Sequence, residues 1–333
     1  MSARTPELVV TTSPFAADTA TTPRIMFEVL SAALVVTLVA CWYFGIGALL
    51  VVGAATVGAV GAEWFFTRRE SPSPLRDYSA VLTGVLLGLT LPPAIPLWMA
   101  VLGGAAGIGL GKLMFGGLGQ NLFNPALVGR AFLQAAFPTS ITTWSKPVPP
   151  GGFFDIPSSL FALPLMHPEV EVVSTATPLG LAKFESQLTD FTPLFFGETA
   201  GSLGETSALL LVLCGLVLGA RRLFDWRLPV SIVLSVAVFA QALHWISPEA
   251  YPPAHFMIFS GGLLFGAVFM ATDPVTTPTP ARGAWIFGIG VGFLVVLIRL
   301  FGGLPEGVMY AILLMNAATP HINRHTQPKP FGA

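Results

Sequence analysis

Hydrophobic residues occur in long runs along this chain, and each run is close to the length that an α-helix needs to cross a lipid bilayer. A spanning helix takes about 20 apolar residues, and the usual range begins near 17. Ten runs reach or approach that length. They cover residues 25–46, 49–66, 78–91, 97–115, 122–137, 207–220, 228–246, 255–271, 284–300 and 306–319. This pattern predicts an all-α polytopic membrane protein with about ten transmembrane helices.

The composition supports a membrane environment. Of the 333 residues, 53% are hydrophobic and only 10% are charged, whereas soluble domains carry about 25% charged residues. The mean hydropathy is +0.75. A soluble protein this apolar could not cover its surface with polar groups, so the lipid bilayer must solvate much of the chain. The net charge of −1 and the absence of a basic run indicate no nucleic-acid partner.

Polar stretches divide the chain into five regions. Residues 1–24 are rich in Thr and Pro and lack the order of a secretory signal, so we predict a disordered cytoplasmic tail before an uncleaved first helix. Residues 25–137 and 205–320 each hold five hydrophobic runs, and 138–204 form a long loop between them. Residues 321–333 form a second cytoplasmic tail.

Positive charges in the short connections orient the predicted helices. Arginines occupy the connection after the second run, at 68, 69 and 76, and the connection after the sixth, at 221, 222 and 227. With ten spans, these connections lie on the same side of the membrane as both termini. The long loop holds only Lys146 and Lys183. The positive-inside rule therefore places both termini in the cytoplasm and residues 138–204 in the periplasm.

The two halves echo each other in sequence. The tetrapeptide Phe-Gly-Gly-Leu at 115–118 precedes the fifth run and recurs at 301–304 before the tenth, and residues 83–88 resemble 260–265. Five spans per half would make an inverted repeat. Prolines interrupt runs at Pro92-Pro93, Asn124-Pro125 and Asp273-Pro274. Broken helices line cavities or bind ligands at membrane depth, although Pro and Gly are also simply common in membrane helices.

Few ionisable groups are placed for chemistry inside the membrane. Glu28 and Glu63 lie near the cytoplasmic ends of the first two runs, and we expect both at the membrane interface. Arg130 falls within the short fifth run, in the company of Asn124. An intramembrane arginine needs a partner or an aqueous cavity, so we predict that Asn124 and Arg130 line a polar site for an anionic or polar ligand. The two cysteines belong to no metal-binding motif.

The long loop contains a hydroxyl-rich turn, Glu171-Val-Val-Ser174-Thr175-Ala176-Thr177-Pro-Leu. Local chemistry alone favours a Ser/Thr turn closed by a proline, with no further role.

Three stretches resemble one membrane protein family. They are residues 116–132, with Gly-Gly-Leu-Gly-Gln-Asn-Leu-Phe-Asn-Pro-Ala-Leu-Val-Gly-Arg-Ala-Phe, residues 271–276, with Ala-Thr-Asp-Pro-Val-Thr, and residues 316–320, with Asn-Ala-Ala-Thr-Pro. They are similar to the D subunits of bacterial Rnf electron-transport complexes and to the related B subunits of sodium-translocating NADH:quinone reductases. The similarity extends over nearly the whole chain.

The resemblance implies a covalent flavin on the long loop. In this family FMN is attached through its phosphate to a threonine, within a pattern that falls here on Glu171, Ser174, Thr175, Ala176 and the acceptor Thr177. Glu171 stands where Asp is usual, and Thr175 stands where Gly is usual. Thr175 adds a second hydroxyl beside the acceptor and is therefore the alternative attachment site.

The resemblance also implies the setting of this flavin. The chain would be part of an inner-membrane translocase, not catalytic alone, and would carry electrons between ferredoxin or NADH chemistry and the transport of Na⁺ or H⁺. Its partners would be the A, B, C, E and G subunits of the Rnf complex, a flavin transferase and the lipid bilayer. Two other hypotheses remain open: an inverted-repeat solute transporter or channel without a redox role, and a passive scaffold.

Overall fold

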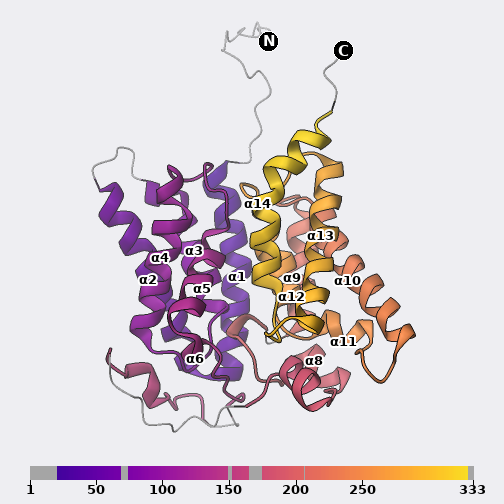
Figure 1. Ribbon diagram of the computed structural model, residues 1–333. Coiled ribbons are helices and arrows are strands. Elements are labelled where there is room, and N and C mark those ends of the chain that lie inside the picture. The colour runs from indigo at the N-terminus through magenta and orange to yellow at the C-terminus, as the bar shows by residue number, and fades with distance from the viewer. Residues whose placement is uncertain (1–20, 69–73, 149–151, 165–174, 206, 329–333) are drawn as a thin grey trace, which may run out of the picture.

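The computed structural model describes residues 21–68, 74–148, 152–164, 175–205 and 207–328 (Figure 1). Every regular element in these ranges is helical, as the hydrophobic runs predicted. The first part contains α1 (Thr22–Phe44), α2 (Ile46–Thr67), α3 (Ser79–Leu89), α4 (Leu97–Gly111) and α5 (Pro125–Ala136). The loop region contains α6 (Pro138–Ile141), α7 (Pro178–Gly180) and α8 (Phe191–Phe196). The last part contains α9 (Ala208–Ala220), α10 (Arg227–Ile246), α11 (Ala254–Phe259), α12 (Leu263–Phe265), α13 (Ala281–Phe301) and α14 (Val308–Thr326).

Five of the described helices are long and apolar enough to cross a membrane by themselves: α1, α2, α4 with the 3₁₀ turn that follows it, α10 and α13. Helices α3 and α9 are apolar but shorter, with 11 and 13 residues. The structure therefore confirms a multi-helix membrane protein. The number of ten spans stays a prediction, because the short helices do not reach spanning length alone.

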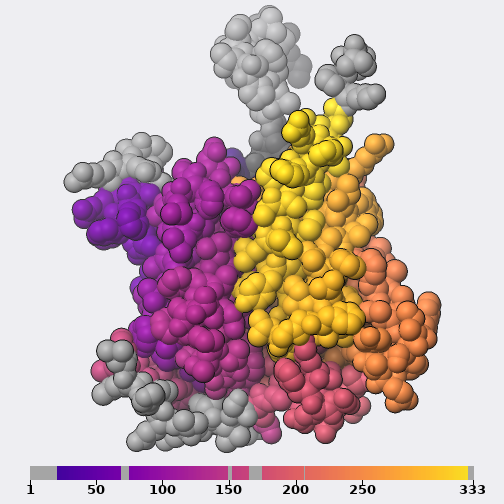
Figure 2. All heavy atoms as spheres, viewed as in Figure 1, coloured from indigo at the N-terminus to yellow at the C-terminus, as the bar shows by residue number. Residues whose placement is uncertain are grey.

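The helices form two groups that lie side by side (Figure 1). Helices α1 to α5 pack among themselves on the left of the view, and α9 to α14 pack among themselves on the right. The groups meet where α1 contacts α9 and where α5 contacts α14. Figure 2 shows this boundary on one face of the molecule, where the magenta surface of the first group adjoins the yellow surface of α14.

The long loop lies at one end of the two groups. Helix α1 begins and α14 ends at the upper end of Figure 1, whereas α6, α8 and α11 lie at the lower end. The described parts of the loop therefore gather at the end opposite to the start of α1 and the end of α14.

Two glycines show how tightly the first group packs. Gly45 separates α1 from α2 with φ of 74°, which residues with a side chain adopt only with strain, and a Cβ there would lie 2.8 Å from the Phe153 carbonyl oxygen. Gly104 of α4 lies directly against the α2 backbone, where a Cβ would meet the Ala55 carbonyl. Small residues allow this close approach of helices in a membrane.

The interrupted helices differ in part from the sequence prediction. Helix α3 ends at Leu89, before Pro92-Pro93, and α5 begins at Pro125 with Asn124 as its N-cap, both as expected. The run 255–271, expected as one helix that ends near Asp273, instead breaks at residues 260–262 into α11, α12 and a π-helical turn at Gly266–Met270. Gly261 permits this break, since its φ is 64°.

The two ends of the chain also differ from the expected boundaries. Helix α1 begins at Thr22, with Pro23 in its first turn, so the last residues of the predicted N-terminal tail are helical. Helix α14 continues through Pro320 to Thr326, beyond the predicted limits of 306–319. Membrane helices tolerate an internal proline where neighbouring groups satisfy the freed carbonyl. Residues 1–20 and 329–333 lie outside the described ranges.

Candidate functional site

Thr177 begins a short helical segment that comprises α7 and the π-helical turn Leu181–Glu185. Its φ and ψ of −71° and 159° are those of an N-cap, and its Oγ1 accepts a hydrogen bond from the Gly180 amide at 3.1 Å. Pro178 follows at the first helical position, where the missing amide costs nothing. The cap uses the Thr177 oxygen only as an acceptor, so the local fold needs the oxygen and not its proton.

Thr175 and Ala176 have different surroundings. The Thr175 amide donates to the Trp144 carbonyl at 3.0 Å, and the Thr175 hydroxyl lies 3.4 Å from the same oxygen. Ala176 is exposed. Glu171 and Ser174, the other members of the predicted attachment pattern, lie outside the described residues.

Lys183 binds the Thr177 segment to the second group of helices through hydrogen bonds. Its Nζ donates to the carbonyl oxygens of Arg299 at 2.9 Å and Leu304 at 3.0 Å, and also to that of Gly302. These carbonyls end α13 or follow it, where a helix leaves its last carbonyls without amide partners. The three N–H bonds of an ammonium group match three such acceptors. Burial lowers the pKa of Lys183.

A cavity of 450 Å³ lies beside Thr177. Its walls come from both groups of helices and from the long loop, and they include Arg130, Gln134, Thr142, Trp144, Thr175, Ala176, Thr177, Phe184, Met309 and Tyr310. This volume falls within the range of about 300–1,000 Å³ that is typical of small-molecule and cofactor sites. The walls combine three aromatic rings and one guanidinium group with the carboxyl groups of Glu185 and Glu306. The rings suit a flat ring system, and the guanidinium group suits an anionic group.

Arg130 is a buried residue of α5 and binds the interrupted end of α3. Its Nη1 donates to the Thr90 carbonyl at 2.8 Å. Within the described part of the chain, this is the side chain's one hydrogen bond. Its other N–H groups therefore remain available in the cavity beside Thr177, whose wall it forms.

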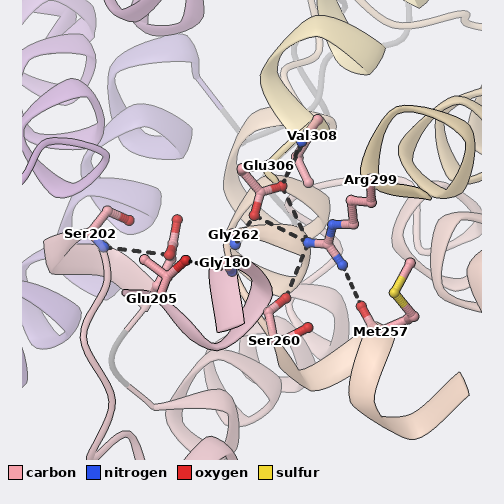
Figure 3. Close-up of polar contacts among 11 residues, drawn as sticks. Gly180, Ser202, Glu205, Met257, Ser260, Gly262, Arg299, Glu306 and Val308 are labelled. Atoms are coloured by element: carbon pink, nitrogen blue, oxygen red, sulfur yellow. Dashed lines mark hydrogen bonds and ion pairs between the residues drawn. The ribbon is translucent and has the colours of Figure 1, made fainter. Parts of the chain in front are cut away.

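A second, smaller cavity of 30 Å³ shares Arg130, Thr177 and Glu306 with the first and extends to Glu205. Glu306 is bound tightly by its surroundings (Figure 3). Arg299 donates to both Glu306 oxygens at 3.2 Å, and the Gly262 amide donates to Oε2 at 3.1 Å. The Gly307 and Val308 amides donate to Oε1 at 3.1 and 3.2 Å. Glu306 thereby also caps the start of α14.

Arg299 holds the interrupted end of α11 in the same way that Arg130 holds α3. Its guanidinium donates to the Met257 carbonyl at 2.5 Å and to the Ser260 carbonyl at 3.1 Å, in addition to its bonds with Glu306 (Figure 3). Only 1% of the Arg299 side chain is exposed, against 21% for Glu306. This ion pair therefore lies at the junction of α11, α13 and α14.

The two carboxyl groups have opposite electrostatic surroundings. Burial, and then the charge of Glu306, raise the pKa of Glu205 above its usual value, although Arg130 and Ser202 act in the other direction. Burial by itself would also raise the pKa of Glu306, but Arg299 and the surrounding amides lower it below its usual value. Glu306 is therefore the member of the pair whose ionised form its surroundings favour.

Three of these residues did not figure in the sequence prediction: Glu205, Arg299 and Glu306. A signal existed for Arg299, because it lies within the apolar run 284–300 and an arginine in such a run needs a partner. Glu205 and Glu306 lie in connections between helices, where a charged residue is unremarkable, and only the packing of the two groups brings them together.

Asn124 does not share the site of Arg130. It caps α5, since its Oδ1 accepts from the amides of Ala126 at 3.0 Å and Leu127 at 3.3 Å, and its Nδ2 donates to the Met270 carbonyl at 3.2 Å. Asn124 lines a separate cavity of 70 Å³ between the two groups, together with Asn121, Lys112 and Asp273. The Oδ1 atom of Asn121 is buried there without a hydrogen-bond partner among the described residues.

Glu63 is fully buried inside the protein, and its expected depth at the membrane interface stays a prediction. It pairs with Lys112 of the segment that follows α4, and the Lys112 ammonium also donates to the Ser79 hydroxyl at 2.6 Å. Pairing of this kind is what permits a carboxylate to be buried. Glu28 forms ion pairs with Arg24 at 3.2 Å and Arg221 at 3.0 Å.

The described residues hold no cluster of three or more His, Cys, Asp or Glu side chains that could bind a metal ion. Cys41 and Cys214 are both buried as free thiols.

These features define a multi-helix membrane protein with a ligand-sized cavity where two helical groups meet a long loop. The family model described as "NQR2, RnfD, RnfE family" matches residues 9–332. The chain belongs to this family.

Curated relatives match over nearly their whole length. The chain is 40% identical to the D subunit of the proton-translocating ferredoxin:NAD(+) oxidoreductase complex of Clostridium ljungdahlii, over 97% of this chain and 96% of the relative. It is 41% identical to the D subunit of the ion-translocating oxidoreductase complex of Stutzerimonas stutzeri, over 93% and 92%. It is 38% identical to the protein of the same name from Yersinia enterocolitica, over 97% and 98%.

Proposed function

We propose that this chain is the D subunit of an ion-translocating electron-transport complex and that it carries electrons through FMN bound covalently to Thr177. The names of the relatives support the first part, because they describe D subunits of ion-translocating oxidoreductase complexes and, in one case, of a proton-translocating ferredoxin:NAD(+) oxidoreductase complex. The second part rests on one observation above all: the Thr177 side chain lies on the wall of a 450 Å³ cavity that also contains Arg130.

The cavity suits FMN in two respects. Arg130 would face the phosphodiester, since a guanidinium group with available N–H donors binds phosphate oxygens well. Trp144, Phe184 and Tyr310 would enclose the ring system with aromatic surfaces. FMN, when bound, supplies a carrier that exchanges electrons singly or in pairs, and the protein's task is to hold it and set its electrostatic surroundings.

The geometry favours Thr177 over Thr175 as the acceptor. An ester at Thr177 would keep the oxygen that caps Gly180, whereas an ester at Thr175 would remove the proton that its hydroxyl can donate to Trp144. Phosphoester formation replaces the hydroxyl proton with phosphorus, so it is compatible with an oxygen that acts only as an acceptor.

We place the Thr177 loop in the periplasm and both termini in the cytoplasm, with the two helical groups as inverted five-helix repeats. The skew of arginines among the short connections supports this orientation, and the recurrence of Phe-Gly-Gly-Leu before the fifth and tenth runs supports the repeat. In a protein with Cys41 and Cys214 replaced, Ser158→Cys should react with a membrane-impermeant thiol reagent added from the periplasm. Reaction only after the cytoplasmic face is opened would contradict this topology.

A second, non-covalent flavin is the proposed ligand of the Asn124 cavity, where the Oδ1 atom of Asn121 offers an acceptor. At 70 Å³ the cavity would have to widen to admit a flavin ring. In this proposal the protein interacts with the other subunits of the complex, with the bilayer and with a flavin transferase. The coupled ion is Na⁺ or H⁺.

The test is Thr177→Val, made in the full complex with the transferase co-expressed. Valine keeps the branched shape and removes only the hydroxyl, so we expect normal insertion but complete loss of covalent flavin fluorescence from the denatured protein in a gel. Thr175→Val is the matched control and should retain the fluorescence. Fluorescence lost from Thr175→Val but kept in Thr177→Val would transfer the attachment to Thr175. A wild type without flavin would favour the alternative of a solute transporter or channel.

A further inference from the structure

Glu205 occupies the inner end of the cavity system that begins at Thr177. It ends the 3₁₀ turn Leu203–Glu205, which is tied to the first helical group because the Leu203 amide donates to the Leu91 carbonyl at 3.2 Å. Its carboxylate faces the other group, across the 30 Å³ cavity that Arg130, Thr177 and Glu306 also line. Glu205 therefore lies at the boundary between the two groups and directly behind the proposed flavin attachment site.

A glycine brings the two glutamates together. The Gly262 amide donates to Glu306 Oε2 at 3.1 Å, and a Cβ on the same residue would lie 2.9 Å from Glu205 Oε1. The Gly262 backbone is thus in contact with both carboxylates. Two carboxylates held this close destabilise each other's charge, and the pair favours a state in which one of them carries a proton.

The partners of the two glutamates decide which of them takes the proton. Glu306 accepts hydrogen bonds from the Arg299 guanidinium and from three backbone amides, all of which stabilise its charge. Among the described residues Glu205 accepts only from Ser202, whose amide lies 3.4 Å from Oε2. Glu205 is thus the member of the pair whose ionised form has the weaker support.

The charged groups around Glu205 come from several elements. Glu306 approaches from the connection between α13 and α14, and behind it stands Arg299 of α13 (Figure 3). Arg130 approaches from α5 across the cavity. Lys183, on the Thr177 segment, is engaged with the carbonyls at the end of α13. With both glutamates ionised, the two arginines and the two glutamates balance in charge.

We infer that Glu205 takes up one proton when the cofactor beside it gains an electron and releases that proton when the cofactor is oxidised again. This inference rests on the proposed function. One electron comes from a reduced one-electron carrier of the ferredoxin class and goes to the cofactor on Thr177. One proton comes from water on the loop side and forms an O–H bond on the Glu205 carboxylate. The net charge of the site is then unchanged, which matters because an uncompensated charge is costly where the effective dielectric constant is low.

Infrared difference spectra of the intact complex, reduced with dithionite minus oxidised, test this directly. In the wild type we expect a positive C=O stretching band of a protonated carboxyl group that shifts in D₂O. Glu205→Gln should lose the band. The matched control Glu198→Gln changes an exposed glutamate of the same loop and should keep it. The midpoint potential of the covalent flavin should fall as pH rises, and Glu205→Gln should lower that slope by up to one proton per electron.

The outcomes separate the two proposals. A wild-type complex with covalent flavin but no carboxyl band overturns the role of Glu205 and leaves the proposed function intact. A band that persists in Glu205→Gln assigns the proton to another group and also overturns it. A wild type without covalent flavin overturns the proposed function itself. If Glu205→Gln does not assemble, Glu205→Asp decides, because a band that comes from this position must change frequency in the aspartate variant.

Discussion

Arg130 and Arg299 make similar hydrogen bonds in the two helical groups, but their surroundings differ. Each donates hydrogen bonds to carbonyl groups at the end of an interrupted helix, Arg130 to α3 and Arg299 to α11. Arg299 also forms an ion pair with Glu306 and is almost completely enclosed. Arg130 faces a cavity of 450 Å³ and makes one hydrogen bond within the described residues. Arg299 thus directs both of its terminal nitrogens to protein acceptors, although its Nε has no hydrogen-bond partner among the described residues, and Arg130 keeps donors for a ligand.

This difference shows that the same interaction, a guanidinium group bound to carbonyls at a helix end, can serve two purposes. A helix that ends inside a membrane protein leaves carbonyl groups without amide partners, and a buried guanidinium group satisfies them. In the second group a glutamate neutralises that guanidinium, so the junction of α11, α13 and α14 is structural. In the first group no carboxylate forms an ion pair with Arg130 among the described residues, and its remaining N–H donors face the cavity beside Thr177.

The largest effect should follow from Arg299→Leu. This substitution leaves the half-buried Glu306 without its cation and removes the donors from two carbonyls. Breaking a fully buried ion pair typically costs about 3–5 kcal/mol, which is the upper bound here. We expect a marked fall in the thermal unfolding temperature in detergent, with loss of assembly into the complex. Arg130→Leu is the matched variant. It removes one bond to Thr90, at about 1–3 kcal/mol, so the protein should insert and assemble but transfer electrons poorly.

A double variant sharpens the comparison. Arg299→Leu combined with Glu306→Leu removes both charges together and should recover part of the stability that the single change loses, because paired removal leaves no unpartnered buried charge. Equal stability losses from the two single arginine variants, or full electron transfer in Arg130→Leu, would show that the two arginines do the same work.

Local patterns in the sequence were sufficient for part of this architecture. The long apolar runs predict α1, α2, α4, α10 and α13 closely, because a run of about 20 apolar residues has few alternatives to a spanning helix. Asn124-Pro125 marks the start of α5, since asparagine caps helices and proline suits the first turn. Arg130 could be predicted as a residue of a polar site because an arginine within an apolar run needs a partner or an aqueous cavity.

Tertiary packing decides the rest, and local patterns do not record it. The eighth run is apolar throughout, yet Gly261 and Gly262 break it so that the backbone can reach Glu306. Glu63 lies near the end of its helix, as an interfacial residue would, but α4 ends beside it and supplies Lys112. Asn124 caps α5 and Arg130 lies six residues further along the same helix, yet the two line different cavities.

The smallest effect should come from loss of the hydrogen bonds that join the Thr177 segment to the end of α13. Lys183→Met keeps the length of the side chain and removes three hydrogen bonds to the end of α13. Hydrogen bonds to a charged group contribute about 1.5–3 kcal/mol, and a loss of about 1.4 kcal/mol already means tenfold more frequent opening. Backbone amides of residues 179–185 should therefore exchange with deuterium at least about tenfold faster, whereas the covalent flavin stays attached. Lys146→Met, at the exposed lysine of the same loop, is the control and should leave the exchange unchanged. Unchanged exchange in Lys183→Met would mean that other contacts hold the Thr177 segment against the second group of helices.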